Sequence, residues 1–221
     1  MSGRGEAMEV LSIQTGPVAP LGPDGVPSGI VKTVREGPVN VARLGIDGDG
    51  IADLAVHGGP DKAVYGYPAR HYEAWRADWP EHDVLWGPGG VGENLTVDGL
   101  VEEEVLIGDV FETGGGLTLQ VTQPRQPCFK FAARFDNPRL PKAMVRTGRC
   151  GFYFRVLSEG SLAAGARLER TRAGHPDWSI ARFFRMTTTD LKALTAEDLR
   201  ALADMEALAE VWRIWARDQH G

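Results

Sequence analysis

Residues 117–130 read LTLQVTQPRQPCFK, a short strand-like run followed directly by a loop with two prolines. The run Leu117–Thr122 is rich in Leu and Val and is bounded by turn residues, which predicts a strand. The two prolines fix their own φ and push Gln123 and Gln126 toward extended conformations. This stretch therefore predicts a strand that ends in a stiff arm, with Cys128 held at a set position directly after it.

Similar short apolar runs occur on both sides of this stretch, separated by clusters of Gly, Pro, Asp and Asn. With 28 Gly and 14 Pro in the chain, many short strands joined by turns are favoured over a helical bundle. We expect a mixed β-barrel or sandwich over roughly residues 8–170, interrupted by one helix from Ala69 to Asp78. The further runs are Glu9–Gln14, Gly29–Val34, Glu104–Ile107 and Phe152–Val156.

The last fifty residues have a different pattern, because apolar residues recur there at three- and four-residue intervals. This spacing predicts three short helices, at Asp177–Met186, Thr189–Asp204 and Met205–Asp218. Thr195 and Asp198 have the spacing of a capping box. We therefore divide the chain into a disordered leader (1–7), a β-domain (8–173) and a three-helix C-terminal domain (174–221).

Composition excludes several classes of function. A formal net charge of −6 disfavours a nucleic-acid partner, which requires a concentrated basic surface. The two cysteines form no CxxC pair and cannot provide a disulfide framework, so both are expected to be free thiols in a reducing compartment. No stretch approaches the ~20 apolar residues of a membrane span, and the N-terminus lacks the apolar core of a signal peptide. A cytoplasmic protein without a membrane partner is the expectation.

Cys128 is the first candidate functional residue. Arg125 and Lys130 lie close to it in sequence and, if also close in space, would favour the thiolate over the thiol. A single rigidly held thiolate suits a metal whose other ligands come from a cofactor. The alternative is a buried and inert cysteine, which is the commoner fate of a lone Cys.

The second candidate is the turn His57-Gly58-Gly59-Pro60-Asp61-Lys62. Its two glycines allow backbone N–H groups to converge on an anion, with His57 and Lys62 at the edges. An ordinary surface turn is the alternative. The five histidines have no zinc- or iron-binding spacing. A cysteine hydrolase would require His57 as the partner of Cys128.

Four motifs, taken together and in order, resemble the MOSC domain family, most closely its stand-alone bacterial YiiM-like branch. MOSC is named after the C-terminal domain of molybdenum cofactor sulfurases. The motifs span residues 45–130 and include Glu93 and Asn94 in the second of them. They are GIDGDGIADLAVHGGPDKAVYGYP (45–68), GENLTVDGL (92–100), LIGDVF (106–111) and TQPRQPCFK (122–130).

This resemblance implies a MOSC-type β-barrel followed by a small three-helix domain, with a molybdenum–molybdopterin cofactor whose metal is bound by Cys128. Cys150 would be structural. The implied catalytic residues, including candidates for proton supply, are Cys128, His57, Asp61 and Glu93. The implied contacts to the cofactor are Cys128, Arg125, Lys62, Lys32, His57, Gly58, Gly59 and Asn94. We expect His57, Lys62, Glu93, Asn94, Arg125 and Cys128 to surround one cavity.

The implied activity is reduction of N-hydroxylated compounds, including N-hydroxylated bases and amines. Because the chain lacks a ferredoxin-like set of cysteines, electrons would come from a separate reductase. A cofactor carrier or sulfur-handling protein without turnover is the alternative, and a binding module without cofactor is a third reading. Whether the protein is a monomer or a homodimer is left open.

Overall fold

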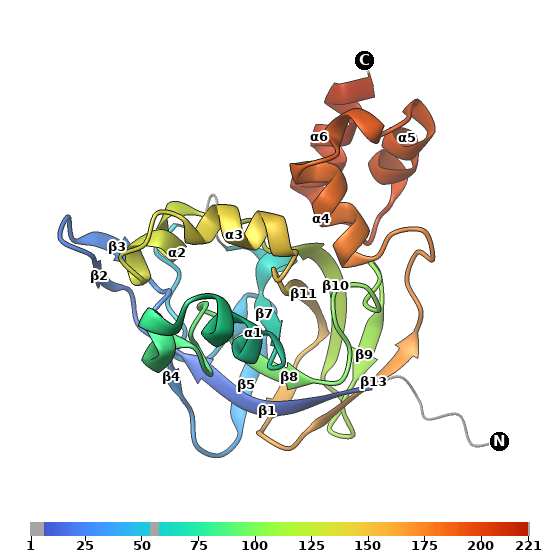
Figure 1. Ribbon diagram of the computed structural model, residues 1–221. Coiled ribbons are helices and arrows are strands. Elements are labelled where there is room, and N and C mark those ends of the chain that lie inside the picture. The colour runs from blue at the N-terminus through green and yellow to red at the C-terminus, as the bar shows by residue number, and fades with distance from the viewer. Residues whose placement is uncertain (1–6, 54–57, 221) are drawn as a thin grey trace.

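The computed structural model describes residues 7–53 and 58–220 and contains a closed β-barrel of seven strands (Figure 1). Closure is made by β1, which pairs with β8 on one side and with β13 on the other. A closed barrel leaves no exposed strand edge along its circumference. In order around the barrel the strands are β13 (Arg167–Arg172), β9 (Val110–Glu112), β10 (Thr118–Pro124), β11 (Phe152–Ser158), β7 (Val64–Pro68), β8 (Leu95–Asp98) and β1 (Ala7–Thr15).

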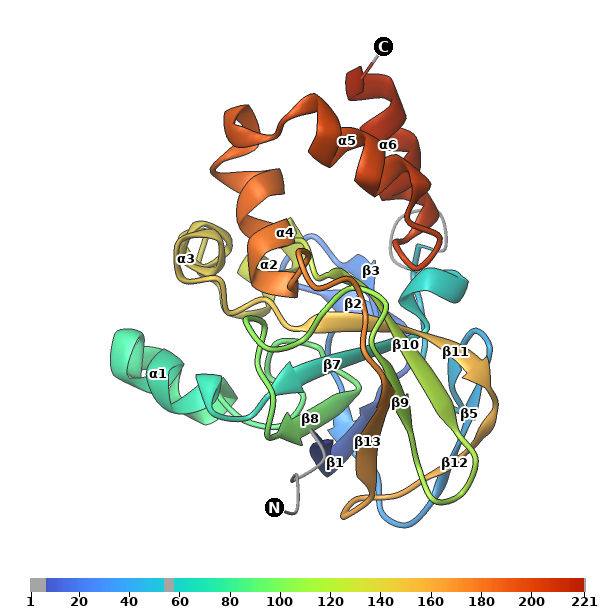
Figure 2. The same ribbon diagram turned by 90° about the vertical axis from the view of Figure 1, so that its right-hand side faces the viewer.

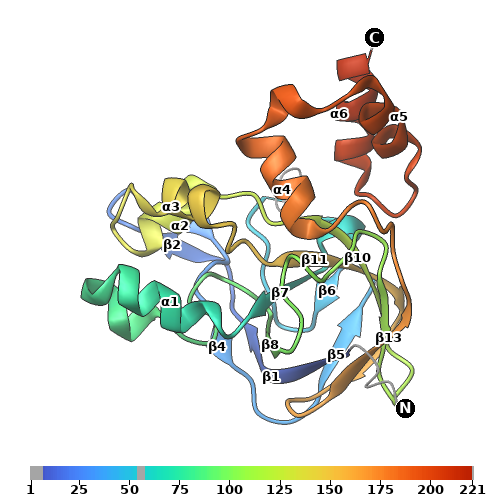
Figure 3. The ribbon, with the colours of Figure 1, turned by 45° about the vertical axis from the view of Figure 1, so that its right-hand side comes forward.

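Neighbouring strands of the barrel are antiparallel except β7 and β8, which are parallel. Parallel neighbours require a crossover connection, and here it contains α1 (His71–Asp78) and the 3-10 segment η2 (Pro80–Leu85). The predicted helix 69–78 is thus present, two residues shorter at its start. Figure 3 shows it beside the barrel, away from the C-terminal helices.

Six further short strands and turns complete the β-region outside the main ring. β4 extends the edge of β1, β5 pairs with both β6 and β12, and β2 pairs with β3. A one-turn 3-10 helix, η1, precedes β7. Their bounds are β2 (Ala19–Leu21), β3 (Val26–Ser28), β4 (Thr33–Val34), β5 (Val39–Ala42), β6 (Gly45–Ile46), β12 (Gly160–Leu162) and η1 (Pro60–Lys62).

The prediction of a single helix within the β-region was wrong, because α2 (Phe129–Arg134) and α3 (Leu140–Thr147) lie between β10 and β11. Both helices are short, so their periodicity is weak in the sequence. α2 is fixed by Phe131, which packs edge-on against the stacked rings of Trp75 and Trp86 from the crossover. The helix that carries Cys128 at its start is therefore held by buried aromatic packing.

Two predicted strands were also wrong in part. Glu104–Ile107 forms turns, with one isolated bridge from Leu106 to Ser179. Of Gly29–Val34, only the last two residues form a strand, and Gly29–Lys32 is a loop. The predicted leader is described only at Ala7, which already belongs to β1, and residues 1–6 lie outside the described residues.

The C-terminal helices are α4 (Ile180–Thr188), α5 (Ala196–Asp204) and α6 (Glu210–His220), with the 3-10 turn η3 (Leu191–Ala193) between the first two. Thr195 and Asp198 form the predicted capping box at the start of α5. We call α4–α6 the appendage; it stands over one end of the barrel (Figures 1 and 2). Its buried residues belong to the same hydrophobic cluster as the barrel core.

Within the described ranges 7–53 and 58–220, no helix is both long and apolar enough to cross a membrane.

Candidate functional site

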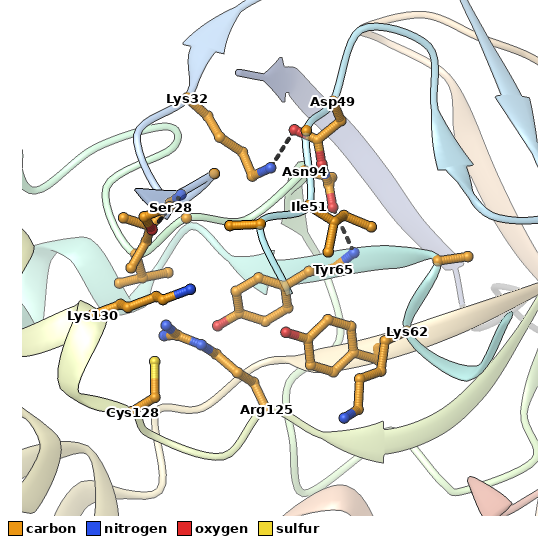
Figure 4. A pocket seen from close by; sticks show the side chains of 18 of the residues that line it. Ser28, Lys32, Asp49, Ile51, Lys62, Tyr65, Asn94, Arg125, Cys128 and Lys130 are labelled. Atoms are coloured by element: carbon orange, nitrogen blue, oxygen red, sulfur yellow. Dashed lines mark hydrogen bonds and ion pairs between the residues drawn. The ribbon is translucent and has the colours of Figure 1, made fainter. Parts of the chain in front are cut away.

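An open cavity is lined by residues of β7 and β11 and by the segments before β7, before β8 and after β10 (Figure 4). Segments far apart in the sequence contribute to it, including the proline-rich arm and the loop after β3. The lining comes from residues 28–30 and 32, 49–52, 62, 63 and 65, 91, 92 and 94, 125, 126, 128 and 130, and from Tyr153 of β11.

Cys128 occupies the N-cap position of α2 with extended backbone dihedrals, φ −134° and ψ 167°. Extended dihedrals are typical of an N-cap residue, and the two prolines restrict Gln123 and Gln126 in the arm before it. Its side chain is half-buried and lines the cavity. Figure 4 shows the sulfur facing the guanidinium of Arg125 and the ammonium of Lys130. The arm thus presents one thiol beside two cations.

Arg125 is the most deeply placed of these cations, with 6% of its surface exposed. Its guanidinium carbon lies 5.4 Å from the centroid of the Tyr65 ring and 5.3 Å from that of Phe131. Its Nη1 is buried and has no hydrogen-bond partner among the described residues. A buried charged donor without a partner is costly, so Arg125 is suited to an anionic ligand in the cavity.

Lys32, Asp49 and Asn94 form a closed network on the other side of the cavity. The Lys32 ammonium is bound to Asp49 Oδ1, and Asn94 Nδ2 donates to Asp49 Oδ2 at 2.8 Å. Asn94 Oδ1 accepts from the backbone N–H of Tyr65 at 3.0 Å. Burial lowers the pKa of Lys32 despite the opposing effect of Asp49. The side chains of Lys32 and Asn94 are engaged by the protein itself.

Lys62 enters the cavity from η1, which places it apart from Cys128 in Figure 4. Burial lowers its pKa, while the neighbouring Asp61 acts in the opposite direction. Together with Arg125, Lys130 and Lys32, it gives the described cavity wall four cationic side chains against one carboxylate, that of Asp49. In a chain of net charge −6, this is a local concentration of positive charge.

Two predicted acids lie outside the lining of the cavity. The Glu93 carboxylate is fully buried, and its Oε1 accepts hydrogen bonds from the Tyr72 hydroxyl (2.5 Å), the Gly89 N–H (2.8 Å) and Thr96 Oγ1 (2.8 Å). Asp61 is engaged by groups of β11 and α6. Glu93 Oε2 is buried without a hydrogen-bond partner among the described residues, but neither Glu93 nor Asp61 lines the cavity.

The remaining predicted residues belong to the glycine turn. Gly58 and Gly59 are not among the residues that line the cavity, although Gly59 precedes η1 with φ 90°, a conformation that favours glycine. His57 lies outside the described residues. Of the predicted set, the structure brings together Lys32, Lys62, Asn94, Arg125 and Cys128.

Sequence reasoning missed the two tyrosines of the cavity, Tyr65 and Tyr153. They are directly opposite each other across β7 and β11, and their ring centroids are 5.0 Å apart. Tyr65 lies in the motif VYGYP, but its partner follows from strand register, which a single sequence does not give. Burial raises the pKa of both tyrosines, so their hydroxyl groups stay protonated at neutral pH.

The donor set fits a cofactor that contains both phosphate and a thiophilic metal. Cationic side chains and the unpartnered Nη1 of Arg125 suit a phosphate, and the Cys128 thiol provides one soft ligand. In the part of the chain that the structure describes, no three His, Cys, Asp or Glu side chains gather in a way that could hold a metal. This donor set fits a metal that brings its other ligands with a cofactor.

Comparison with known proteins gives matches over most of the chain. The family profile of the MOSC domain matches residues 53–169. "Uncharacterized protein YflK" of Bacillus subtilis is 42% identical over 213 residues, which are 94% of this chain and 92% of that protein. A Gibberella moniliformis protein named "Reductase" is 38% identical over 161 residues, 73% of this chain but 28% of that protein. The crystal structure of YiiM from Geobacillus stearothermophilus has a TM-score of 0.79 and 33% identity, and the match covers 97% of this chain and 100% of that one.

Proposed function

Because the chain belongs to the MOSC domain family, we propose that it binds a molybdenum–molybdopterin cofactor through Cys128 and reduces N-hydroxylated compounds. The observation that carries this proposal is the cavity itself, in which one accessible thiol faces Arg125 and Lys130. The fungal relative that is named a reductase supports an oxidoreductase over a simple binding module.

Different residues of the cavity would bind different parts of the cofactor. Cys128 provides the thiolate ligand, and the proline-rich arm fixes its position before any ligand arrives. Arg125 binds a phosphate oxygen through Nη1, with Lys130 and Lys62 adding positive charge. The bound cofactor supplies two-electron redox chemistry at molybdenum. Tyr65 and Tyr153 give the cavity an aromatic wall with protonated hydroxyl groups.

Proton supply falls to groups at the cavity rather than to Glu93 or Asp61, whose carboxylates are held elsewhere. Lys62 is one candidate, since it lines the cavity and burial lowers its pKa, which makes its ammonium a stronger acid than that of an exposed lysine. His57, which lies outside the described residues, is the other candidate.

The proposal is tested on protein purified from a host that makes the cofactor. Molybdenum and pterin are measured in the purified protein, and turnover of an N-hydroxylated base is followed with a chemical reductant and with a separate reductase as electron donors. Stoichiometric molybdenum with turnover supports a reductase. Bound cofactor that is released to an acceptor protein without turnover indicates a carrier, and absence of both metal and pterin contradicts the proposal. The mass of the loaded protein in solution decides between monomer and homodimer.

A further inference from the structure

The Asp61 carboxylate joins three elements that are far apart in the sequence. Its Oδ1 accepts from Arg155 on β11, from Nε at 2.8 Å and Nη2 at 2.5 Å. Its Oδ2 accepts from the backbone N–H of Glu210, the first residue of α6, at 2.8 Å. Figure 2 shows the short helix before β7 directly below the start of α6. One carboxylate thus ties η1 to the barrel wall and to the appendage.

This carboxylate belongs to a turn with little packing of its own. η1 has only three residues, none of them buried, and its N-cap makes no side-chain hydrogen bond. It is also held by its backbone, because the Thr122 hydroxyl donates to the carbonyl of Asp61 at 2.6 Å. A turn without a buried side chain depends on such polar contacts for its position. The contacts of Asp61 therefore help to fix the position of η1.

The next residue of the same turn is Lys62, whose side chain lines the cavity. Lys62 has a four-carbon side chain with several rotatable bonds, so the location of its ammonium depends on where its backbone is fixed. The two side chains extend from η1 in different directions. That of Asp61 contacts β11 and α6, and that of Lys62 lines the cavity.

We propose that Asp61 is a positioning residue that holds Lys62 in the cavity for binding of an anionic ligand, and that the start of α6 takes part in this hold. A carboxylate at a helix N-terminus is favourable because it accepts an otherwise unpaired N–H and lies at the positive end of the helix dipole. The appendage thereby contributes to the anion affinity of a cavity that it does not line. The identity of the natural ligand rests on the proposed function, whereas the test below does not depend on it.

The test uses the full chain made without cofactor and inorganic pyrophosphate as the probe, with affinity measured by titration calorimetry. We expect Asp61→Asn to weaken binding about fivefold, and Lys62→Gln to weaken it by a similar factor, for charge-assisted contacts at a partly exposed site. In the Lys62→Gln background, Asp61→Asn should have little further effect, because both substitutions remove the same contact. Arg155→Gln should reproduce Asp61→Asn.

Asp190→Asn is the matched control, since Asp190 pairs with Arg185 within the appendage at 3.3 Å and lies far from η1 in sequence. It should leave the pyrophosphate affinity unchanged. Hydrogen exchange gives a second readout, because the Lys62 N–H that donates to the Gly59 carbonyl should exchange faster in Asp61→Asn. Circular dichroism of each variant excludes global unfolding as the cause.

Independent effects of Asp61→Asn and Lys62→Gln would overturn the inference, as would unchanged affinity in Asp61→Asn. Lack of measurable pyrophosphate binding by the unsubstituted chain would also overturn it, because Asp61 would then have no anion affinity to control. A positive result with pyrophosphate in a protein that never acquires molybdenum would leave this inference standing and contradict the proposed function.

Discussion

The two sides of the cavity use similar residue types in different ways. On the Asp49 side, Lys32, Asp49 and Asn94 satisfy one another, and their hydrogen bonds run to the backbone of β1 and β7. On the Cys128 side, the buried Nη1 of Arg125 has no hydrogen-bond partner in the part of the chain that the structure describes, and the thiol lines the cavity. Charge alone therefore does not identify a binding group. The groups left with unused bonding capacity are the ones available to a ligand.

Cys128→Ser is expected to give the largest effect on the Cys128 side. A neutral hydroxyl replaces a soft thiolate ligand, so turnover of N-hydroxylated substrate should fall at least about 1000-fold, equivalent to roughly 4 kcal/mol. The melting temperature should change little, because the arm and the aromatic packing of α2 are untouched. Activity and molybdenum content are measured together on the purified variant.

Cys150→Ser is the matched control, because this thiol is fully buried and does not line the cavity. Its activity should stay near that of the unsubstituted protein, with a modest loss of stability from a buried hydroxyl. Loss of molybdenum in Cys150→Ser but not in Cys128→Ser would show that Cys150, and not Cys128, is the metal ligand.

The sequence was sufficient for features that depend on neighbouring residues. The arm that carries Cys128 follows from its prolines, and the capping box follows from Thr195 and Asp198. Features that depend on register or distant partners could not be derived in this way. Asp61 and Lys62 are adjacent in one motif, yet only the second lines the cavity, since Arg155 and the start of α6 engage the first.

Asp49→Ala tests whether the Asp49 side of the cavity stabilises the fold rather than binding the ligand. It leaves the buried Lys32 ammonium and the Asn94 amide without their partner, and breaking a buried ion pair costs about 3 kcal/mol. We expect a loss of that size in the free energy of unfolding, measured with urea. Lys32→Met added to Asp49→Ala should recover part of it, because no unpaired charge remains. A stable Asp49→Ala variant with reduced pyrophosphate affinity would instead show that this side binds the ligand.

Arg125→Met tests the guanidinium on the Cys128 side, whose Nη1 has no hydrogen-bond partner among the described residues. The substitution keeps an apolar chain between Tyr65 and Phe131 but removes the charged donor, so pyrophosphate affinity should fall about tenfold to thirtyfold, roughly 1.5–2 kcal/mol. Binding is measured on the chain without cofactor. An unchanged affinity would show that the buried nitrogen serves no ligand, and Arg125 would then be a packing residue.

The smallest expected effect is on the pH dependence of pyrophosphate affinity, which distinguishes Lys32 from Lys62. Burial lowers the pKa of both Lys32 and Lys62, so each ammonium loses its proton at a lower pH than an exposed lysine. Only the protonated form of Lys62 attracts a phosphate, so its contribution to pyrophosphate affinity should be lost as pH rises, at a lower pH than for an exposed lysine. A decrease of about threefold is expected for one partly exposed charge. Lys62→Gln should flatten this part of the profile, whereas Lys32→Met should keep it, because Lys32 is already bound to Asp49. If Lys32→Met flattens the profile and Lys62→Gln does not, the roles of the two sides are reversed.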